Sequence, residues 1–243
     1  MRQLLGSTLF WLFFVTSILV YAPLVVLSYP LPYRWRYPFA TGWARLNLRW
    51  LKLTCGLGYH VEYEGELPKG SAIVFSKHQS TWETLALQEI LPAQVWVLKR
   101  ELLWIPFFGW GLAALEPIAI DRGAGRQAVQ QLVTQGIRRL ERGRWVVIFP
   151  EGTRVPPGKR VRYRIGGAVL AEKSGYPVVP VAHNAGVYWP KHRFLKRPGT
   201  IRVVVGKAID THGKSATEIL QEAENWIESR VAQMSGNGRN EPK

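Results

Sequence analysis

The chain has 243 residues, which is enough for one domain of moderate size with its own core and an appendage. Its formal net charge of +15 indicates an anionic partner, either a nucleic acid, a phosphorylated substrate or an anionic membrane surface. The single cysteine, Cys55, excludes an internal disulfide, and no Cys/His set has the spacing of a zinc site, so we expect no metal.

The N-terminal stretch is the first predicted element. Residues 4–30 form an uncharged, apolar run of roughly 25 residues, long enough to cross ~30 Å of bilayer hydrocarbon. The run is too long for a signal peptide and lacks a small-residue cleavage site. We expect a membrane helix that either spans the bilayer or, because of Pro23, is kinked and half-inserted. A helix buried in a soluble protein is the alternative.

The next stretch, residues 31–56, alternates basic residues with tryptophans. Such a pattern predicts an interfacial helix on anionic lipid, and 11 tryptophans in the chain favour the same environment. The basic excess lies after the apolar run, which predicts the cytoplasmic (inner) membrane with the rest of the chain on the cytosolic side. The residues concerned are Arg34, Arg36, Arg45, Arg49 and Lys52 beside Trp35, Trp43 and Trp50.

The remainder alternates short apolar runs with helical stretches. Continuous apolar strands between helices predict an α/β fold, with a mostly parallel sheet flanked by helices behind the membrane-associating segment. The boundaries follow as residues 1–57 for the membrane segment, 58–234 for the α/β domain and 235–243 for a disordered tail. The predicted strands are residues 72–76, 94–98, 117–120, 145–149, 177–181 and 201–205, and the clearest amphipathic helices are residues 126–142 and 216–234.

The strand at 72–76 leads into His78, and Glu83 follows five residues later. On one continuous helix these side chains would diverge by about 140°, so they can meet only if His78 lies in the turn before the helix. Ser80 or Thr81 is a suitable N-cap there. A second interpretation is a capping box, because Ser80-Thr81-Trp82-Glu83 fits S-x-x-E and Glu83 would then bond only the cap amide.

Other strand ends carry further polar residues. The strand at 145–149 runs into Pro150-Glu151-Gly152-Thr153-Arg154, where Gly152 permits close backbone approach and Arg154 suits a phosphate. The strand at 117–120 ends before Arg122, and Lys99 follows another. Because ligands of open α/β sheets bind beyond the carboxyl ends of strands, these residues are candidates for one site. Each also has a simple alternative as a solvated turn residue.

Together, four blocks between residues 75 and 181 resemble the glycerolipid acyltransferases, and within them the bacterial 1-acyl-sn-glycerol-3-phosphate acyltransferases. "HQSTWE" is similar to the first family motif, "EPIAIDR" to the second, "FPEGTR" to the third and "PVVPVAH" to the fourth, in the family's order. The third block is the most specific. Glu83 stands where most members have Asp, which lengthens the carboxylate arm by a methylene.

The resemblance implies acyl transfer from acyl-CoA or acyl carrier protein to the hydroxyl of lysophosphatidic acid, without cofactor. His78 would act as general base, oriented by Glu83. Backbone amides near the helix start would hold the oxyanion. Glu151, Gly152, Thr153 and Arg154 would bind the glycerol phosphate, with Arg122 assisting and Lys99 as a further candidate. Residues 101–117 would line the acyl-chain pocket, or form ordinary core.

Three alternatives remain open at this stage. The first is an enzyme of the same superfamily that acylates another acceptor, such as lysophosphatidylglycerol, an ornithine lipid or glycerol 3-phosphate. A membrane-tethered nucleic-acid-binding module would explain the charge, but no recognisable binding motif supports nucleic acid as a partner. The "HGKS" at residues 212–215 is not a phosphate-binding loop, because Ala208 replaces its first glycine. A non-catalytic lipid-binding relative would not need His78.

Overall fold

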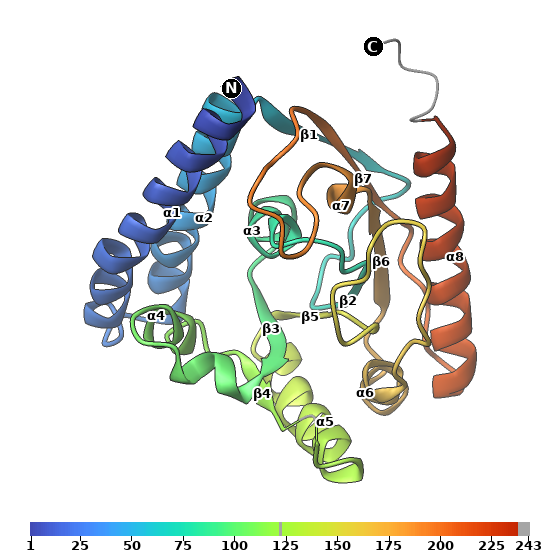
Figure 1. Cartoon of the computed structure of the whole chain (residues 1–243). Helices are drawn as coiled ribbons and strands as arrows, with labels where there is room; N and C mark the ends of the chain where they lie inside the picture. Colours follow the sequence, from blue (N-terminus) through green and yellow to red (C-terminus); the bar gives the residue numbers. More distant parts are fainter. Residues whose placement is uncertain (122, 238–243) are drawn as a thin grey trace.

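The structure is a computed structural model that describes residues 1–121 and 123–237. Seven strands form one sheet in the order β1-β7-β6-β2-β5-β3-β4 (Figure 1). Five of them, β2, β3, β4, β5 and β6, run parallel, whereas β7 is antiparallel to β6 and β1 is parallel to β7. The strands are β1 (Leu57–Tyr63), β2 (Ile73–Ser76), β3 (Gln94–Lys99), β4 (Ile118–Ile120), β5 (Trp145–Ile148), β6 (Val178–His183) and β7 (Gly199–Val205).

The expected α/β class with a mostly parallel, helix-flanked sheet is therefore confirmed. All six predicted strands are present with shifts of one or two residues at their ends. The sequence prediction missed β1, an edge strand whose outer half is largely exposed. Its side chains need no continuous apolar run, because only one neighbour, β7, pairs with it.

Helices cover both faces of the sheet. One face packs on α5 (Arg126–Glu141), α6 (Gly166–Ser174) and α8 (Ala216–Asn237), and its core includes Leu132, Leu170 and Ile219. The other face packs on α2 (Tyr33–Cys55) and α3 (Trp82–Ile90), with Leu51 and Leu87 fully buried. Helix α8 extends to Asn237, three residues past the expected end, and the rest of the predicted tail, 238–243, lies outside the described residues.

Helix α1 (Arg2–Leu27) lies alongside α2 and completes the second face (Figure 1). In the described part of the chain it is the one helix long and apolar enough to cross a membrane. Phe10 on one side of α1 is fully buried in the same core as Leu51 and Leu87. The other side leaves a row of large apolar side chains exposed: Leu4, Leu5, Leu9, Leu12, Val15, Leu19, Val20 and Leu24. The N-terminal segment thus shares the core of the α/β domain.

Helix α2 differs from the expected interfacial helix in which residues face outward. Trp43 donates a hydrogen bond to Ser17 Oγ (2.9 Å) and Trp50 to the carbonyl of Leu9 (3.2 Å), so both indoles pack on α1. Arg36 is buried because its guanidinium pairs with Glu116 (2.5 Å). Arg34, Arg45, Arg49, Lys52 and Trp35 remain exposed, as an interfacial surface requires.

Glu116 ties several distant elements together, a role that the sequence analysis did not assign. Its carboxylate pairs with Arg36 from α2 and with Arg144 (2.5 Å) from the segment before β5, and its carbonyl accepts a hydrogen bond from Arg139 of α5. Those contacts hold the pKa of Glu116 below its usual range, although burial acts to raise it. Three short helices complete the described structure. The elements η1 (Arg100–Trp104) and α4 (Phe108–Ala113) lie between β3 and β4 in the chain, and α7 (Ala185–Tyr188) follows β6.

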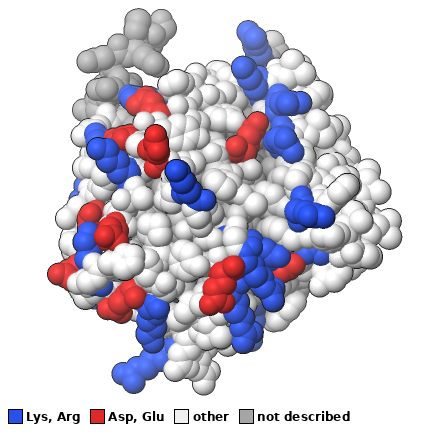
Figure 2. All heavy atoms as spheres, turned by 180° about the vertical axis from the view of Figure 1, so that it is seen from behind, with Lys and Arg blue, Asp and Glu red and all other residues white. Residues whose placement is uncertain are grey.

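The positive charge is not gathered into one continuous surface on the back of the molecule. Figure 2 shows separate groups of Lys and Arg there, divided by uncharged surface and mixed with acidic side chains on the side that carries α8. The basic side chains that contribute to the net charge of +15 therefore form several separate groups on this face.

Candidate active site

The turn between β2 and α3 brings His78 and Glu83 together. His78 Nδ1 lies 2.8 Å from Glu83 Oε1, and Thr81 is the N-cap, so the histidine precedes the helix as predicted. The same carboxylate oxygen accepts the amides of Gln79 (2.8 Å) and Ser80 (2.7 Å). The two sequence interpretations therefore coexist, because Glu83 caps the turn and also holds the histidine ring.

Glu83 is completely buried. Burial acts to raise its pKa, but the neighbouring His183, the hydrogen bond and charge of His78 and the amide of Ser80 outweigh that effect and hold the pKa below its usual value. An ionised carboxylate on Nδ1 fixes the proton of a neutral His78 on that nitrogen. Nε2 is then free to accept a proton.

The ring of His78 is also held on its face. It stacks on Phe149, with ring centroids 3.9 Å apart and an interplanar angle of 13°, and Phe149 in turn stacks on Trp96. The sequence analysis did not single out Phe149, although it directly precedes the "PEGTR" block. Flat stacking leaves the ring little freedom to tilt, so Nε2 keeps one direction.

The "FPEGTR" loop clamps the backbone of His78 from both sides. Glu151 Oε2 accepts the amide of His78 (2.6 Å), and the carbonyl of His78 accepts the amide of Val155 (2.8 Å). Gly152, with φ +68°, closes the turn between these contacts, where a Cβ would lie 2.6 Å from Arg164 Nε. This loop and the His78 turn therefore form one unit.

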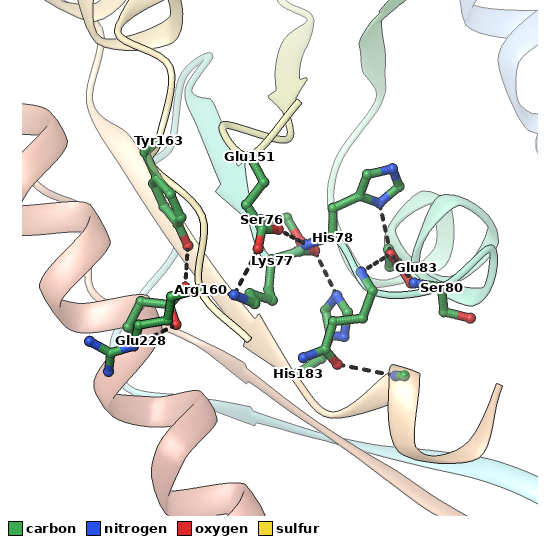
Figure 3. A network of polar contacts seen from close by, with 12 residues as sticks. Ser76, Lys77, His78, Ser80, Glu83, Glu151, Arg160, Tyr163, His183 and Glu228 are labelled. Carbon is green, nitrogen blue, oxygen red and sulfur yellow. Dashed lines mark hydrogen bonds and ion pairs between the residues drawn. The ribbon is translucent and has the colours of Figure 1, made fainter. Parts of the chain in front are cut away.

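Behind the histidine lies a buried ionic network (Figure 3). Lys77 is 1% exposed, and its Nζ contacts Glu151 Oε1 (2.7 Å) and Glu228 Oε1 (2.6 Å) of α8. Tyr163 donates a hydrogen bond to the same Glu228 oxygen (2.9 Å). Burial raises the pKa of Glu151 to about 7, against the opposing effect of Lys77. Neither Lys77 nor Glu228 was predicted, since they are 151 residues apart in the chain.

A second histidine, His183 at the end of β6, supports the turn from below. Its Nε2 lies 2.8 Å from the carbonyl of Lys77, and its Nδ1 accepts the amide of Ala185 (3.2 Å). These partners assign the proton to Nε2, and complete burial lowers the pKa of His183. His183 therefore holds the backbone of the turn at Lys77. It belongs to the fourth sequence block, but no local signal distinguished it.

His78 opens into a cavity of about 420 Å³, within the usual size range of ligand pockets. Its walls are largely apolar and come from α1, α2, α3, β3 and the 101–117 segment, and Arg154 and Thr81 are polar residues that also line it. The 101–117 segment contributes six residues to the cavity lining: Leu102, Ile105, Phe108, Gly111, Leu112 and Leu115.

The other predicted site residues lie in different surroundings. Glu151 faces Lys77 and the His78 amide and lines neither this cavity nor a second one beside it, because its charge is used inside the domain. Thr153 is exposed and near Lys191 Nζ (3.4 Å). Lys99 is exposed, its Nζ lies 3.6 Å from Glu101 Oε1, and it lines neither cavity. Arg122 lies outside the described residues. Within residues 1–121 and 123–237, no cluster of three or more potential metal ligands is present.

The arrangement is a carboxylate-bonded histidine that lines a largely apolar cavity together with an arginine, and such a histidine has the chemistry to accept a proton from a bound hydroxyl group. The chain belongs to the acyltransferase family, whose model, described as "Acyltransferase", matches residues 59–184. Like the other members, it is an acyltransferase.

Individual relatives agree with the family. The chain is 43% identical to the 1-acyl-sn-glycerol-3-phosphate acyltransferase of Pseudomonas aeruginosa, over 96% of this chain and 93% of the relative. It is 30% identical to the protein of the same name from Saccharomyces cerevisiae, over 77% of this chain and 63% of that relative. The crystal structure of the 1-acyl-sn-glycerophosphate acyltransferase of Thermotoga maritima matches the fold with a TM-score of 0.79, 22% identity and 96% coverage of each chain.

Proposed function

We propose that this acyltransferase moves a fatty acyl group from an acyl thioester, acyl-CoA or acyl carrier protein, to the sn-2 hydroxyl of 1-acyl-glycerol 3-phosphate, giving phosphatidic acid. The observation that carries the proposal is the His78–Glu83 pair, whose histidine lines the apolar cavity together with Arg154. An apolar chain, a reacting hydroxyl and a phosphate each find a matching environment there.

The chemistry follows from the state of His78. Nε2 of His78 accepts the proton of the acceptor hydroxyl while the oxygen of that hydroxyl attacks the thioester carbonyl. Glu83 stabilises the imidazolium that forms. Collapse of the tetrahedral intermediate breaks the C–S bond, and the imidazolium returns the proton to the leaving thiolate. No G-x-S-x-G nucleophile elbow occurs in the sequence, which supports direct transfer.

Four backbone amides of the turn between β2 and α3 already donate hydrogen bonds inside the protein. The amide of His78 is bonded to Glu151, those of Gln79 and Ser80 to Glu83, and that of Trp82 to Ser80 Oγ (3.2 Å). Amides that already have partners inside the protein are poor donors to an oxyanion. Within this turn, His78 and Thr81 line the cavity, and we assign the oxyanion contact to Thr81 because the amide of His78 is already bonded to Glu151.

Glu151 and Gly152 have a positioning role in this proposal, because they shape the turn that holds His78. Arg154 is the residue of that block that contacts the acceptor phosphate. The chain of the transferred acyl group occupies the cavity between α1, α2 and the 101–117 segment.

The N-terminal helices bring this site to its substrates. The exposed apolar side of α1 enters the inner leaflet of the cytoplasmic membrane from the cytosolic side, and Arg45, Arg49 and Lys52 of α2 contact anionic headgroups. Because α1 also supplies cavity residues such as Phe14 and Ile18, an acyl chain passes from the leaflet into the cavity without crossing water.

The test is thiol release by the detergent-purified protein with long-chain acyl-CoA or acyl carrier protein, with and without 1-acyl-glycerol 3-phosphate. We expect acceptor-dependent release that falls by about 10²–10⁴-fold or more in His78→Ala, the range that general bases supply. His60→Ala, an exposed histidine on β1, is the matched control and should keep full activity. Full activity of His78→Ala would refute the assignment. Thiol release only with another lysolipid would contradict the proposed acceptor and would leave the reaction class, acyl transfer from a thioester, in place.

A further inference from the structure

A second cavity, of about 280 Å³, lies beside the first and shares the wall formed by Thr81 and Arg154. Its other wall is the segment between α7 and β7, which lies outside the residues that the family model matches. The complete lining is Trp11, Thr81, Arg154, Trp189, Pro190, His192, Arg193 and Phe194.

The charge of this cavity is one-sided. Arg154, Arg193 and His192 all line it, and no carboxylate contributes to the lining. Among the described residues, neither guanidinium forms an ion pair or a side-chain hydrogen bond. Lys191 Nζ, near Thr153, adds another positive charge beside the cavity. Two unpaired guanidiniums at one small cavity favour an anion with several oxygens.

The segment that carries Arg193 is firmly attached to α1. Lys196 is fully buried, with Nζ 3.7 Å from the centre of the Trp11 ring and bonded to the carbonyl of Phe194 (2.9 Å). The amide of Lys196 donates to Ser7 Oγ (3.0 Å), and Trp11 Nε1 donates to the same Phe194 carbonyl (3.0 Å). The backbone next to Arg193 is therefore held in place by the fold, so binding of a ligand needs to order only the Arg193 side chain.

We propose that Arg193, assisted by His192, binds the phosphate of the lysolipid acceptor from the side opposite Arg154 and so selects phosphate-bearing acceptors. This inference rests on the proposed function. The acceptor fits better than the donor, because its phosphate is carried by the carbon next to the one with the reacting hydroxyl. In acyl-CoA and acyl carrier protein the phosphate lies at the far end of the pantetheine arm from the thioester, whereas this cavity shares its wall with the cavity of His78.

The test compares Arg193→Gln with Arg197→Gln in the full chain. Arg197 is an exposed arginine four residues further on that lines neither cavity, so its variant makes the same charge change elsewhere on the segment. We expect Arg193→Gln to raise the KM for 1-acyl-glycerol 3-phosphate about tenfold and to leave the KM for acyl-CoA and kcat within about twofold. Arg193→Lys should recover part of the loss, and Arg197→Gln should match the unmodified protein.

A direct binding measurement separates this proposal from the proposed function. Radiolabelled 1-acyl-glycerol 3-phosphate is titrated onto the purified protein without donor, with 1-acyl-glycerol as the phosphate-free probe. We expect Arg193→Gln to weaken binding of the phosphate-bearing probe about tenfold and to leave the phosphate-free probe unchanged.

Each combination of results has a defined meaning. Weaker binding in Arg193→Gln without turnover in the unmodified protein would refute the proposed function and retain the phosphate site. Normal turnover with equal KM and equal binding in both variants would retain the function and overturn the site. A rise in the donor KM alone would overturn the acceptor assignment, because the anion would then belong to the donor.

Discussion

Lys77→Met tests whether the buried ionic network holds the catalytic turn. The substitution keeps a side chain of similar length but removes the ammonium that contacts both Glu151 (2.7 Å) and Glu228 (2.6 Å). Two carboxylates are then left close together in a buried place. Glu228 retains the hydroxyl of Tyr163 and the largely exposed Arg160 (3.3 Å), whereas Glu151 retains only the His78 amide.

The magnitude follows from this arrangement. Removal of one partner from a buried ion pair costs about 3–5 kcal/mol, and two unit charges about 5 Å apart repel by about 3 kcal/mol at an effective dielectric constant of 20. The two estimates describe the same loss and are not added. We expect a decrease of about 3–5 kcal/mol in the free energy of unfolding, which for a chain of this size lowers Tm by roughly 10 °C.

The assay is thermal unfolding of the detergent-purified protein at pH 8 and pH 6, followed by tryptophan fluorescence. Burial raises the pKa of Glu151 to about 7 in the unmodified protein, where Lys77 acts to lower it, so loss of Lys77 raises this pKa further. At pH 6 Glu151 is largely protonated in both proteins, whereas at pH 8 the unmodified protein holds it ionised beside Lys77 and the variant has lost that partner. The loss of Tm should therefore be smaller at pH 6 than at pH 8. Lys69→Met, at an exposed lysine, is the control and should change Tm little at either pH. An equal, small change in Lys77→Met and Lys69→Met would refute the reasoning.

Two further predictions concern the carboxylates of the site. Glu83→Gln should lower kcat by about 10²–10⁴-fold with little change in KM, because an amide neither holds the proton on Nδ1 of His78 nor stabilises the imidazolium. Steady-state kinetics tests this, with Glu62→Gln at an exposed position as the control. An unchanged kcat in Glu83→Gln would contradict the proposed role of Glu83. Glu151→Gln should alter the dependence of stability on pH. Since burial raises the pKa of Glu151 from 4.5 to about 7, the folded state binds more protons in that window and stability decreases as pH rises through it, by about 3 kcal/mol in total. The variant should lack this decrease in denaturation curves recorded from pH 4.5 to 8, and an unchanged profile would show that Glu151 does not titrate there.

The sequence by itself was sufficient for those features that depend on local pattern. Apolar strands between helices predicted the sheet, and the carboxyl ends of parallel strands meet at one edge whatever the details of packing. The contact between His78 and Glu83 could also be predicted from local pattern. A helix start between two residues five apart brings them together through backbone geometry alone.

Tertiary structure decided which way ambiguous side chains point. Glu151 at a strand end was predicted to bind the substrate, whereas in the structure its carboxylate faces inward to Lys77, which also contacts Glu228. Trp43 and Trp50 fit a lipid surface by pattern, yet both bond to α1, because the apolar face of that helix needed a partner.

The remaining site residues come from segments that are distant in the chain. Phe149 lies 71 positions after His78, Glu228 lies 151 after Lys77, and Arg193 comes from a loop whose position depends on its attachment to α1. Local periodicity carries no information about such pairs, since a contact between distant segments is set by which faces the completed fold brings together. The sequence was enough to predict the His78–Glu83 contact, whereas the packing of α1, α8 and the α7–β7 segment determined the surroundings of that pair, because those contacts join residues that are distant in the chain.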